Sequence, residues 1–310
     1  MISSFFGKTK PITHMVLAVL LFLVYFSPIF LAPGEHRIEG QLPLELLCFG
    51  ILLLAIFIIN LTVRTEKITE SNSYAALFFV LLTMAFPENL SYNNAILANF
   101  FVMLALWRLL SLKSIRGVKH KIFDATILIC IASLFYDWAL VLLLLILMVI
   151  NSYDRKTFKN WLVPLLGVAT VFIITFTALK LYDSLDFFGD HYRFSTGTLQ
   201  ASSLEEVISA KALVYVLLVL LVALLLYLRL RRVGSGRILQ LRIFLLAFLL
   251  GVGITLFTHE DAHPLMITYF PASVFMANYF EGIKKPRLRG FILLVGILLA
   301  LSLFAIELRG

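Results

Sequence analysis

The chain has 310 residues, of which 61% are hydrophobic and only 14% are charged, and its mean hydropathy is +0.98. Water-soluble domains have about 45–50% apolar and about 25% charged residues. One core of this length cannot bury so much apolar surface, so the composition excludes an ordinary soluble protein. The net charge of +8 does not indicate nucleic-acid binding, because the basic residues stand in short clusters between apolar runs.

Eleven apolar runs follow one another along the chain. The hydrocarbon core of a bilayer offers the backbone no hydrogen-bonding partners and takes about 20 apolar residues to cross, so we predict a helix for each run. The expected fold is an all-α, polytopic helical bundle in a single membrane domain, residues 1–310. The expected spans are 14–32, 43–63, 74–87, 94–111, 124–136, 138–151, 161–182, 211–230, 243–258, 264–281 and 290–307.

The first run follows Lys8 and Lys10 and fits either a retained first span or a secretory signal peptide. A retained span is favoured, because a small-residue cleavage pattern is poorly formed after it.

The basic residues predict the orientation of these spans. With eleven spans, nearly all of the 26 Lys and Arg residues fall on one side, which places the amino terminus in the cytoplasm. The exceptions are Arg37, Lys180, Arg193, Lys211 and Arg309. The acidic residues concentrate on the external side, where polar chemistry is therefore expected.

Two spans, 124–136 and 138–151, are unusually short and are predicted to form a hairpin with Asp137 at its tip. One long helix crossing once is the alternative, but it would put Arg155 and Lys156 outside. The longest external segment, 183–210, mixes aromatic and acidic residues.

Neither a nucleotide-binding glycine motif nor a hydrolase or zinc-protease motif is present. Cys48 and Cys130 lie inside apolar runs, so a disulfide is not expected. We predict no cofactor. Binding of a divalent metal remains an alternative for residues 258–263, where two imidazoles and two carboxylates stand close together in the sequence.

Acidic residues of the external segments are the candidate catalytic groups, since a carboxylate at the bilayer surface can act as a general base. The alternative for each of these residues is an ordinary solvated charge in a loop, without a catalytic role. If the hairpin tip lies within the membrane, an acidic residue there costs free energy and is therefore expected to have a function. The candidates are Glu35, Glu39, Glu88 and Asp137.

Residues of two later external segments are the candidate substrate-binding groups. A guanidinium with neighbouring His and Tyr can hold a phosphate, and a polar turn between spans can hold a ligand or only close a hairpin. The candidates are His191, Tyr192, Arg193, His259 and Asp261. Asn93, Asn94 and Asn99 are predicted to hydrogen-bond between helices.

The order of elements resembles the membrane module of polyprenyl-phosphate-sugar-dependent glycosyltransferases, the GT-C superfamily. The resemblance follows from an acidic first external loop, the connection 87–91, the segment 99–110, the hairpin 132–138 and the long external loop. It covers residues 10–210 and leaves 211–310 as additional transmembrane helices. Residues 1–12, with these segments, are also similar to an uncharacterised family of Bacteroidetes inner-membrane proteins.

The GT-C resemblance implies inverting sugar transfer from a polyprenyl phosphate donor, with Glu35 or Glu39 as base and Arg193 holding the phosphate. The adjacent acidic pair common in that superfamily is missing, and the first loop is short. The expected function is therefore to handle a polyprenyl-phosphate-linked sugar, as an enzyme or an accessory subunit, in the bacterial inner membrane. A non-catalytic scaffold that binds other membrane subunits is the alternative, and a transporter is the third possibility. Membrane lipids are expected partners and nucleic acid is not.

Overall fold

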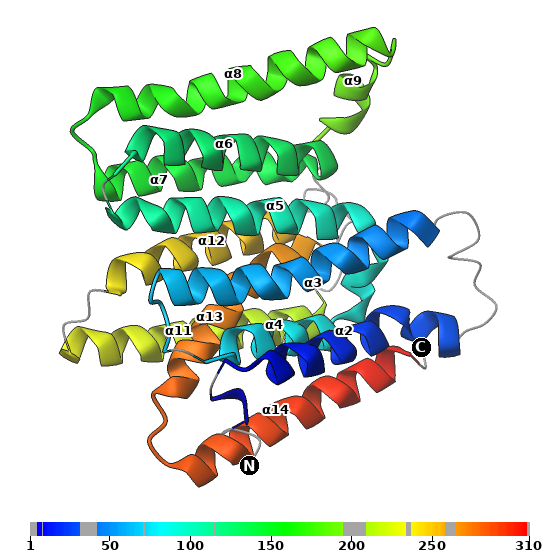
Figure 1. The fold of residues 1–310 in the computed structure, drawn as a ribbon, viewed down its shortest axis with the longest axis vertical. Coiled ribbons are helices and arrows are strands. Elements are labelled where there is room, and N and C mark those ends of the chain that lie inside the picture. Colours follow the sequence, from blue (N-terminus) through cyan, green and yellow to red (C-terminus); the bar gives the residue numbers. More distant parts are fainter. Residues whose placement is uncertain are drawn as a thin grey trace.

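The computed structural model describes residues 5–7, 9–31, 42–70, 72–114, 116–194, 209–233, 237–257 and 264–308, and these contain helices and turns but no strand. Long helices lie side by side in a bundle (Figure 1). They are α2 (Pro11–Leu31), α3 (Leu42–Thr65), α4 (Tyr74–Ala85), α5 (Asn93–Leu110), α6 (Val118–Phe135), α7 (Leu143–Tyr153), α8 (Phe158–Leu181), α11 (Ala210–Val233), α12 (Ile238–Phe257), α13 (Tyr269–Glu281) and α14 (Pro286–Glu307). The shorter elements are the 3-10 helices η1 (Pro87–Ser91), η2 (Ser111–Ser114), η3 (Asp137–Leu142) and η4 (Pro264–Thr268), and the single turn α9 (Phe187–His191).

Six helices of the described chain are long and apolar enough to cross a membrane: α3, α5 with η2, α8, α11, α12 and α14. This is fewer than the eleven crossings predicted from the sequence. The other apolar runs are also helical, but several are short. The 12 residues of α4 extend only about 18 Å, well below the ~30 Å of a hydrocarbon core. The α-helix ends there because Pro87 has no N–H to continue it.

The two helices of the predicted hairpin are separate; α6 is longer than expected, whereas α7 has only 11 residues and is preceded by η3. Helix α6 has 18 residues and begins at Val118 rather than near 124, because Lys119, His120 and Lys121 continue the helix beyond its apolar part. The alternative of one long helix is wrong, since the extended backbone of Tyr136 (φ −147°, ψ 106°) ends α6 before η3 begins.

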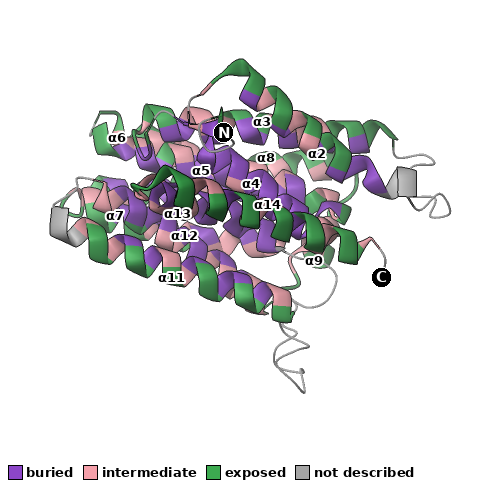
Figure 2. Ribbon diagram, turned by 90° about the horizontal axis from the view of Figure 1, so that it is seen from below, coloured by how far each residue is buried: buried purple, intermediate pink, exposed green. Residues whose placement is uncertain are grey.

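Helices α4 and α13 form the centre of the bundle. Nearly all side chains of both helices are buried, and their aromatic rings meet edge to face, as in Tyr74 with Phe280 at a centroid distance of 4.8 Å. Figure 2 shows the buried residues concentrated on the inner helices, whereas α11 and α14 carry exposed outer faces. These faces consist largely of Leu, Ile, Val and Phe, as expected of surfaces that face lipid.

The segments that carry the basic clusters meet at one end of the bundle, which we name the basic end. Gln240 donates to the carbonyl of Glu66 (3.1 Å). The Glu281 carboxylate accepts from the Asn72 amide (2.6 Å) and from the backbone N–H of Glu70 (3.1 Å). Burial raises the pKa of Glu281. Residues 64–73, 237–242 and 281–289 therefore lie together, although they are far apart in the sequence.

Candidate functional site

Part of the predicted site lies outside the residues that the structure describes, namely Glu35, Glu39, His259 and Asp261. The described candidates lie at the end of the bundle opposite the basic end, on η1, on η3, and at or just after the end of α9. They are Glu88, Asp137, His191, Tyr192 and Arg193.

A strap formed by residues 191–194 is bound to the junction between α6 and η3. The end of α6 leaves the Ser133 carbonyl without an intrahelical partner, and His191 Nε2–H donates to it (2.7 Å). The Ser133 hydroxyl donates to the Cys130 carbonyl (2.7 Å), so the Tyr192 hydroxyl donates to Ser133 Oγ (3.0 Å). The strap therefore satisfies polar groups that the helix end would otherwise leave unpaired.

Asp137 fixes the other end of this strap. Its Oδ1 accepts from the backbone N–H of Trp138 (2.8 Å) and its Oδ2 from the backbone N–H of Phe194 (3.2 Å). The structure thus brings Asp137 together with residues 191–193, which the sequence places in separate loops. Because both carboxylate oxygens hold backbone donors, Asp137 acts here as an anchor for the strap.

Helices α6 and α8 touch closely at one point and then diverge. A Cβ atom at Gly167 would lie 2.7 Å from Thr126 Cγ2, so only glycine permits this approach. The buried residues of α8 all lie in its first half, from Asn160 to Gly167. Beyond that point α8 leans away from α6 toward the end that carries α9 (Figure 1).

A cleft of about 250 Å³, which we name the α6–α8 cleft, occupies this divergence. It is lined by Cys130, Ser133 and Leu134 of α6, Leu140 of η3, Val168, Val171, Phe172 and Thr175 of α8, and Phe188, Tyr192 and Phe194. The walls are mostly apolar, and the lining includes Ser133 and Tyr192, whose hydroxyls are hydrogen-bonded to each other. Burial raises the pKa of Tyr192, as does the nearby Asp137 carboxylate, so the phenol stays a neutral hydrogen-bond donor.

Arg193 does not line this cleft but stands in the chain between the cleft-lining residues Tyr192 and Phe194. Its side chain is 69% exposed and forms an ion pair with Asp190, and its Nε donates to the Gly189 carbonyl (3.3 Å). The arrangement combines an apolar groove, two hydroxyl groups and an accessible guanidinium. It can hold a molecule that has an apolar chain and an anionic head.

Glu88 belongs to a different cluster. Both of its carboxylate oxygens lie 3.2 Å from Lys211 Nζ, which also lies 3.2 Å from Glu307 Oε2 and 4.7 Å from the centre of the Phe86 ring. This ion pair joins η1, α11 and the last turn of α14. It also explains why Lys211 is an exception to the charge distribution, since two carboxylates hold it.

Replacing Lys211 with methionine is expected to lower stability by about 1 kcal/mol, because Glu88 and Glu307 then face each other without a cation. Thermal unfolding in detergent measures the effect. Lys180→Met, which removes an exposed cation of α8, is the matched control. Equal melting temperatures for the two variants would show that this cluster does not hold α14.

Glu45 was not among the residues predicted from the sequence, yet it is the only charged side chain among the buried residues that the structure describes (7% exposed). Its carboxylate accepts from the Tyr25 hydroxyl (2.5 Å) and from the Asn93 amide (3.0 Å), joining α2, α3 and α5. The signal was present, since an acidic residue inside an apolar run is costly unless it has partners. The predicted interhelical bond of Asn93 is confirmed, whereas Asn99 contacts Met103 Sδ of its own helix (3.7 Å).

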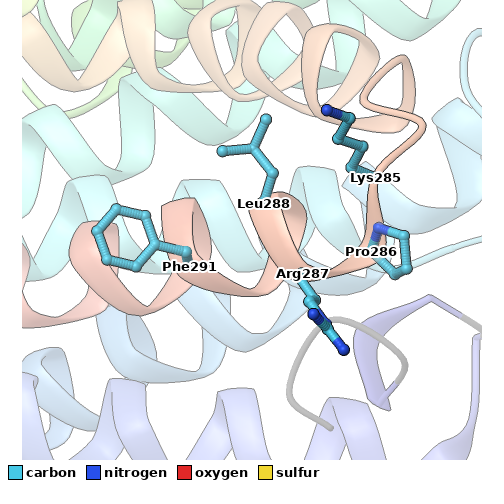
Figure 3. A pocket seen from close by; sticks show the side chains of 5 residues that line it. All are labelled: Lys285, Pro286, Arg287, Leu288 and Phe291. Carbon is cyan, nitrogen blue, oxygen red and sulfur yellow. The ribbon is translucent and has the colours of Figure 1, made fainter.

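Two other features of the described chain do not form a site. No group of three His, Cys, Asp or Glu side chains lies close enough there to hold a metal ion. A hollow of about 560 Å³ beside the start of α14 is lined by Lys285, Pro286, Arg287, Leu288 and Phe291. Figure 3 shows Lys285 and Arg287 pointing in opposite directions from the chain, so these two cations do not converge on one ligand.

Comparison with known proteins gives one match. The profile of a family described as "Family of unknown function (DUF6427)" matches residues 12–309, from the first turn of α2 to beyond the end of α14. Neither a curated protein nor a solved structure matches the chain.

Proposed function

The chain belongs to this family of unknown function (DUF6427), and we propose that it holds a polyprenyl-phosphate-linked sugar in the α6–α8 cleft. The isoprenoid chain lies between α6 and α8, and the phosphate lies against Arg193. The single observation that supports this proposal is the apolar cleft lined by the hydroxyl-bearing Ser133 and Tyr192, with the exposed Arg193 as the next residue of the chain. The resemblance to GT-C glycosyltransferases suggests the isoprenoid and the sugar.

The proposal includes a bundle of eleven crossings in a bacterial inner membrane, with the amino terminus in the cytoplasm. Three short helices are prolonged at one end by 3-10 helices: α4 by η1, α7 by η3 and α13 by η4. With about 2.0 Å of rise per 3-10 residue, α4 and η1 together reach about 28 Å. The buried setting of α4 and α13 tolerates such breaks, because protein rather than lipid surrounds the backbone.

Holding the lipid is proposed ahead of cleaving it. Asp137 anchors the strap and Glu88 is paired with Lys211, so both described carboxylate candidates already have partners. This favours an accessory role, in which the protein presents the lipid-linked sugar to a transferase. A non-catalytic scaffold for other membrane subunits is the second candidate, supported by the same pairing.

Photocrosslinking tests the proposal. Purified full-length protein in detergent is exposed to a photoactivatable polyprenyl phosphate, and the labelled peptide is mapped by mass spectrometry. Label is expected on α6 and α8. Val171→Trp fills the cleft and should reduce labelling about tenfold or more, the effect of losing roughly 1.4 kcal/mol of binding.

The control, Ile173→Trp, adds the same side chain on the exposed face of α8, where Ile173 is 62% exposed, and should label like wild type. Arg193→Ala should weaken labelling by polyprenyl phosphate but not by the uncharged polyprenol. Equal labelling of the Val171→Trp and Ile173→Trp variants would reject the cleft as the site and leave the scaffold.

A further inference from the structure

A second cleft, at the basic end between α2 and α3, has a different chemistry. We name it the α2–α3 cleft. Its volume is about 580 Å³, within the usual range for small-molecule sites. It is lined by Thr9, Lys10, Pro11, His14, Met15, Ala18, Leu53, Ile56, Phe57 and Arg64. None of these lining residues is acidic.

The cleft exists because α2 and α3 pack closely only toward their other ends. There Phe49 of α3 lies against Phe22 and Phe26 of α2, at ring-centroid distances of 5.7 and 5.3 Å. At the basic end, a hydrogen bond from the Asn60 amide to His14 Nδ1 (3.2 Å) joins the two helices. The space around this bond is left open at the surface of the bundle.

The lining changes from cationic to apolar along the cleft. Lys10 directly precedes α2 and Arg64 lies in the last turn of α3, so both cations stand where the helices end. Met15 and Phe57 are exposed apolar residues farther along the helices, at 67% and 60% exposure. This gradient matches a phospholipid, with its phosphate at the helix ends and its acyl chain along the apolar walls.

His14 adds a donor to this lining. Its Nδ1 accepts from Asn60, so the neutral ring carries its hydrogen on Nε2, and a phosphate oxygen can accept it. The amino-terminal end of α2 adds partial positive charge through the helix dipole.

We propose that the α2–α3 cleft binds an anionic glycerophospholipid of the surrounding leaflet, with its phosphodiester between Lys10 and Arg64 and one acyl chain against Phe57. Charge complementarity supports this occupant, because basic residues near a bilayer surface attract anionic lipids at about 1 kcal/mol each. The lipid would fill the opening between α2 and α3 that protein side chains leave. This site is separate from the α6–α8 cleft and does not depend on its function.

Native mass spectrometry tests the proposal. Delipidated full-length protein in detergent is titrated with phosphatidylglycerol or phosphatidylcholine of identical acyl chains. Wild type is expected to retain phosphatidylglycerol about tenfold more strongly. The double variant Lys10→Gln/Arg64→Gln should lose that preference, whereas Lys285→Gln/Arg287→Gln, which removes two cations that point apart (Figure 3), should keep it.

Two further arms identify the ligand. Met15→Trp narrows the apolar part of the cleft and leaves both cations in place. It should weaken the binding of both lipids. Inorganic phosphate should not displace phosphatidylglycerol, since it has no acyl chain. Equal retention of the two lipids by wild type, an unchanged preference in the Lys10→Gln/Arg64→Gln variant, or displacement by inorganic phosphate would each overturn the proposal.

Discussion

Replacing Glu45 with alanine is expected to destabilise the protein by about 2–3 kcal/mol and to loosen the junction of α2, α3 and α5. The substitution removes the acceptor of the Tyr25 hydroxyl and of the Asn93 amide at once. Neutral hydrogen bonds between membrane helices contribute only about 0.6 kcal/mol on average. The larger value is expected here because the acceptor is a carboxylate and two donors lose their partner inside the protein.

Thermal unfolding in detergent measures the loss, and Cys48 reports the local change. Cys48 is fully buried, one turn along α3 from Glu45, so a looser junction should speed its reaction with a thiol reagent in a Cys130→Ser background. Glu45→Gln keeps one acceptor oxygen and should recover at least half of the stability. If Glu45→Ala melts at the wild-type temperature with Cys48 still protected, the carboxylate does not join the three helices.

The second large effect is expected at the crossing of α6 and α8. In Gly167→Ala the new methyl group would meet Thr126 Cγ2 at 2.7 Å and Thr126 Cβ at 2.8 Å. The helices must move apart, which costs about 1–3 kcal/mol. Alanine favours a helix over glycine by about 1 kcal/mol. A net loss of stability would therefore show that the clash with Thr126 costs more than the higher helix propensity of alanine contributes.

Gly253→Ala in α12 is the matched control, because nothing lies within 4 Å of a Cβ at that position. It should be neutral or stabilising. Combining Gly167→Ala with Thr126→Gly removes the side chain that the new methyl group would meet, so the double variant should be more stable than the sum of the single changes predicts. Additive losses would mean that the two residues do not meet.

The α6–α8 cleft should respond to Gly167→Ala as well. Moving the crossing point changes the angle at which α8 leaves α6, and the cleft lies beyond that point along both helices. Binding of the photoactivatable polyprenyl phosphate should therefore fall in Gly167→Ala and stay unchanged in Gly253→Ala. This result would connect a packing defect inside the bundle to the proposed ligand.

Local residue order explains why some elements were predicted well. A helix satisfies the backbone hydrogen bonds of an apolar run without help from water, and helices occupy all of the predicted runs. The number of crossings was less predictable, since only six of these helices meet the criterion of length and hydropathy. The short helix α4 ends where Pro87 interrupts it, and α6 ends at the extended residue Tyr136.

The sequence by itself determined that the chain is apolar, helical and asymmetric in charge, because hydropathy and the basic clusters are properties of neighbouring residues. It also showed Asp137 and Arg193 as polar residues in an apolar chain. Only the tertiary structure decided that Asp137 anchors the strap carrying Arg193, that Glu45 joins three helices, and that Gly167 lets α8 cross α6 and then diverge. These outcomes depend on contacts between residues far apart in the chain, and packing geometry, rather than the type of either residue, selects such contacts.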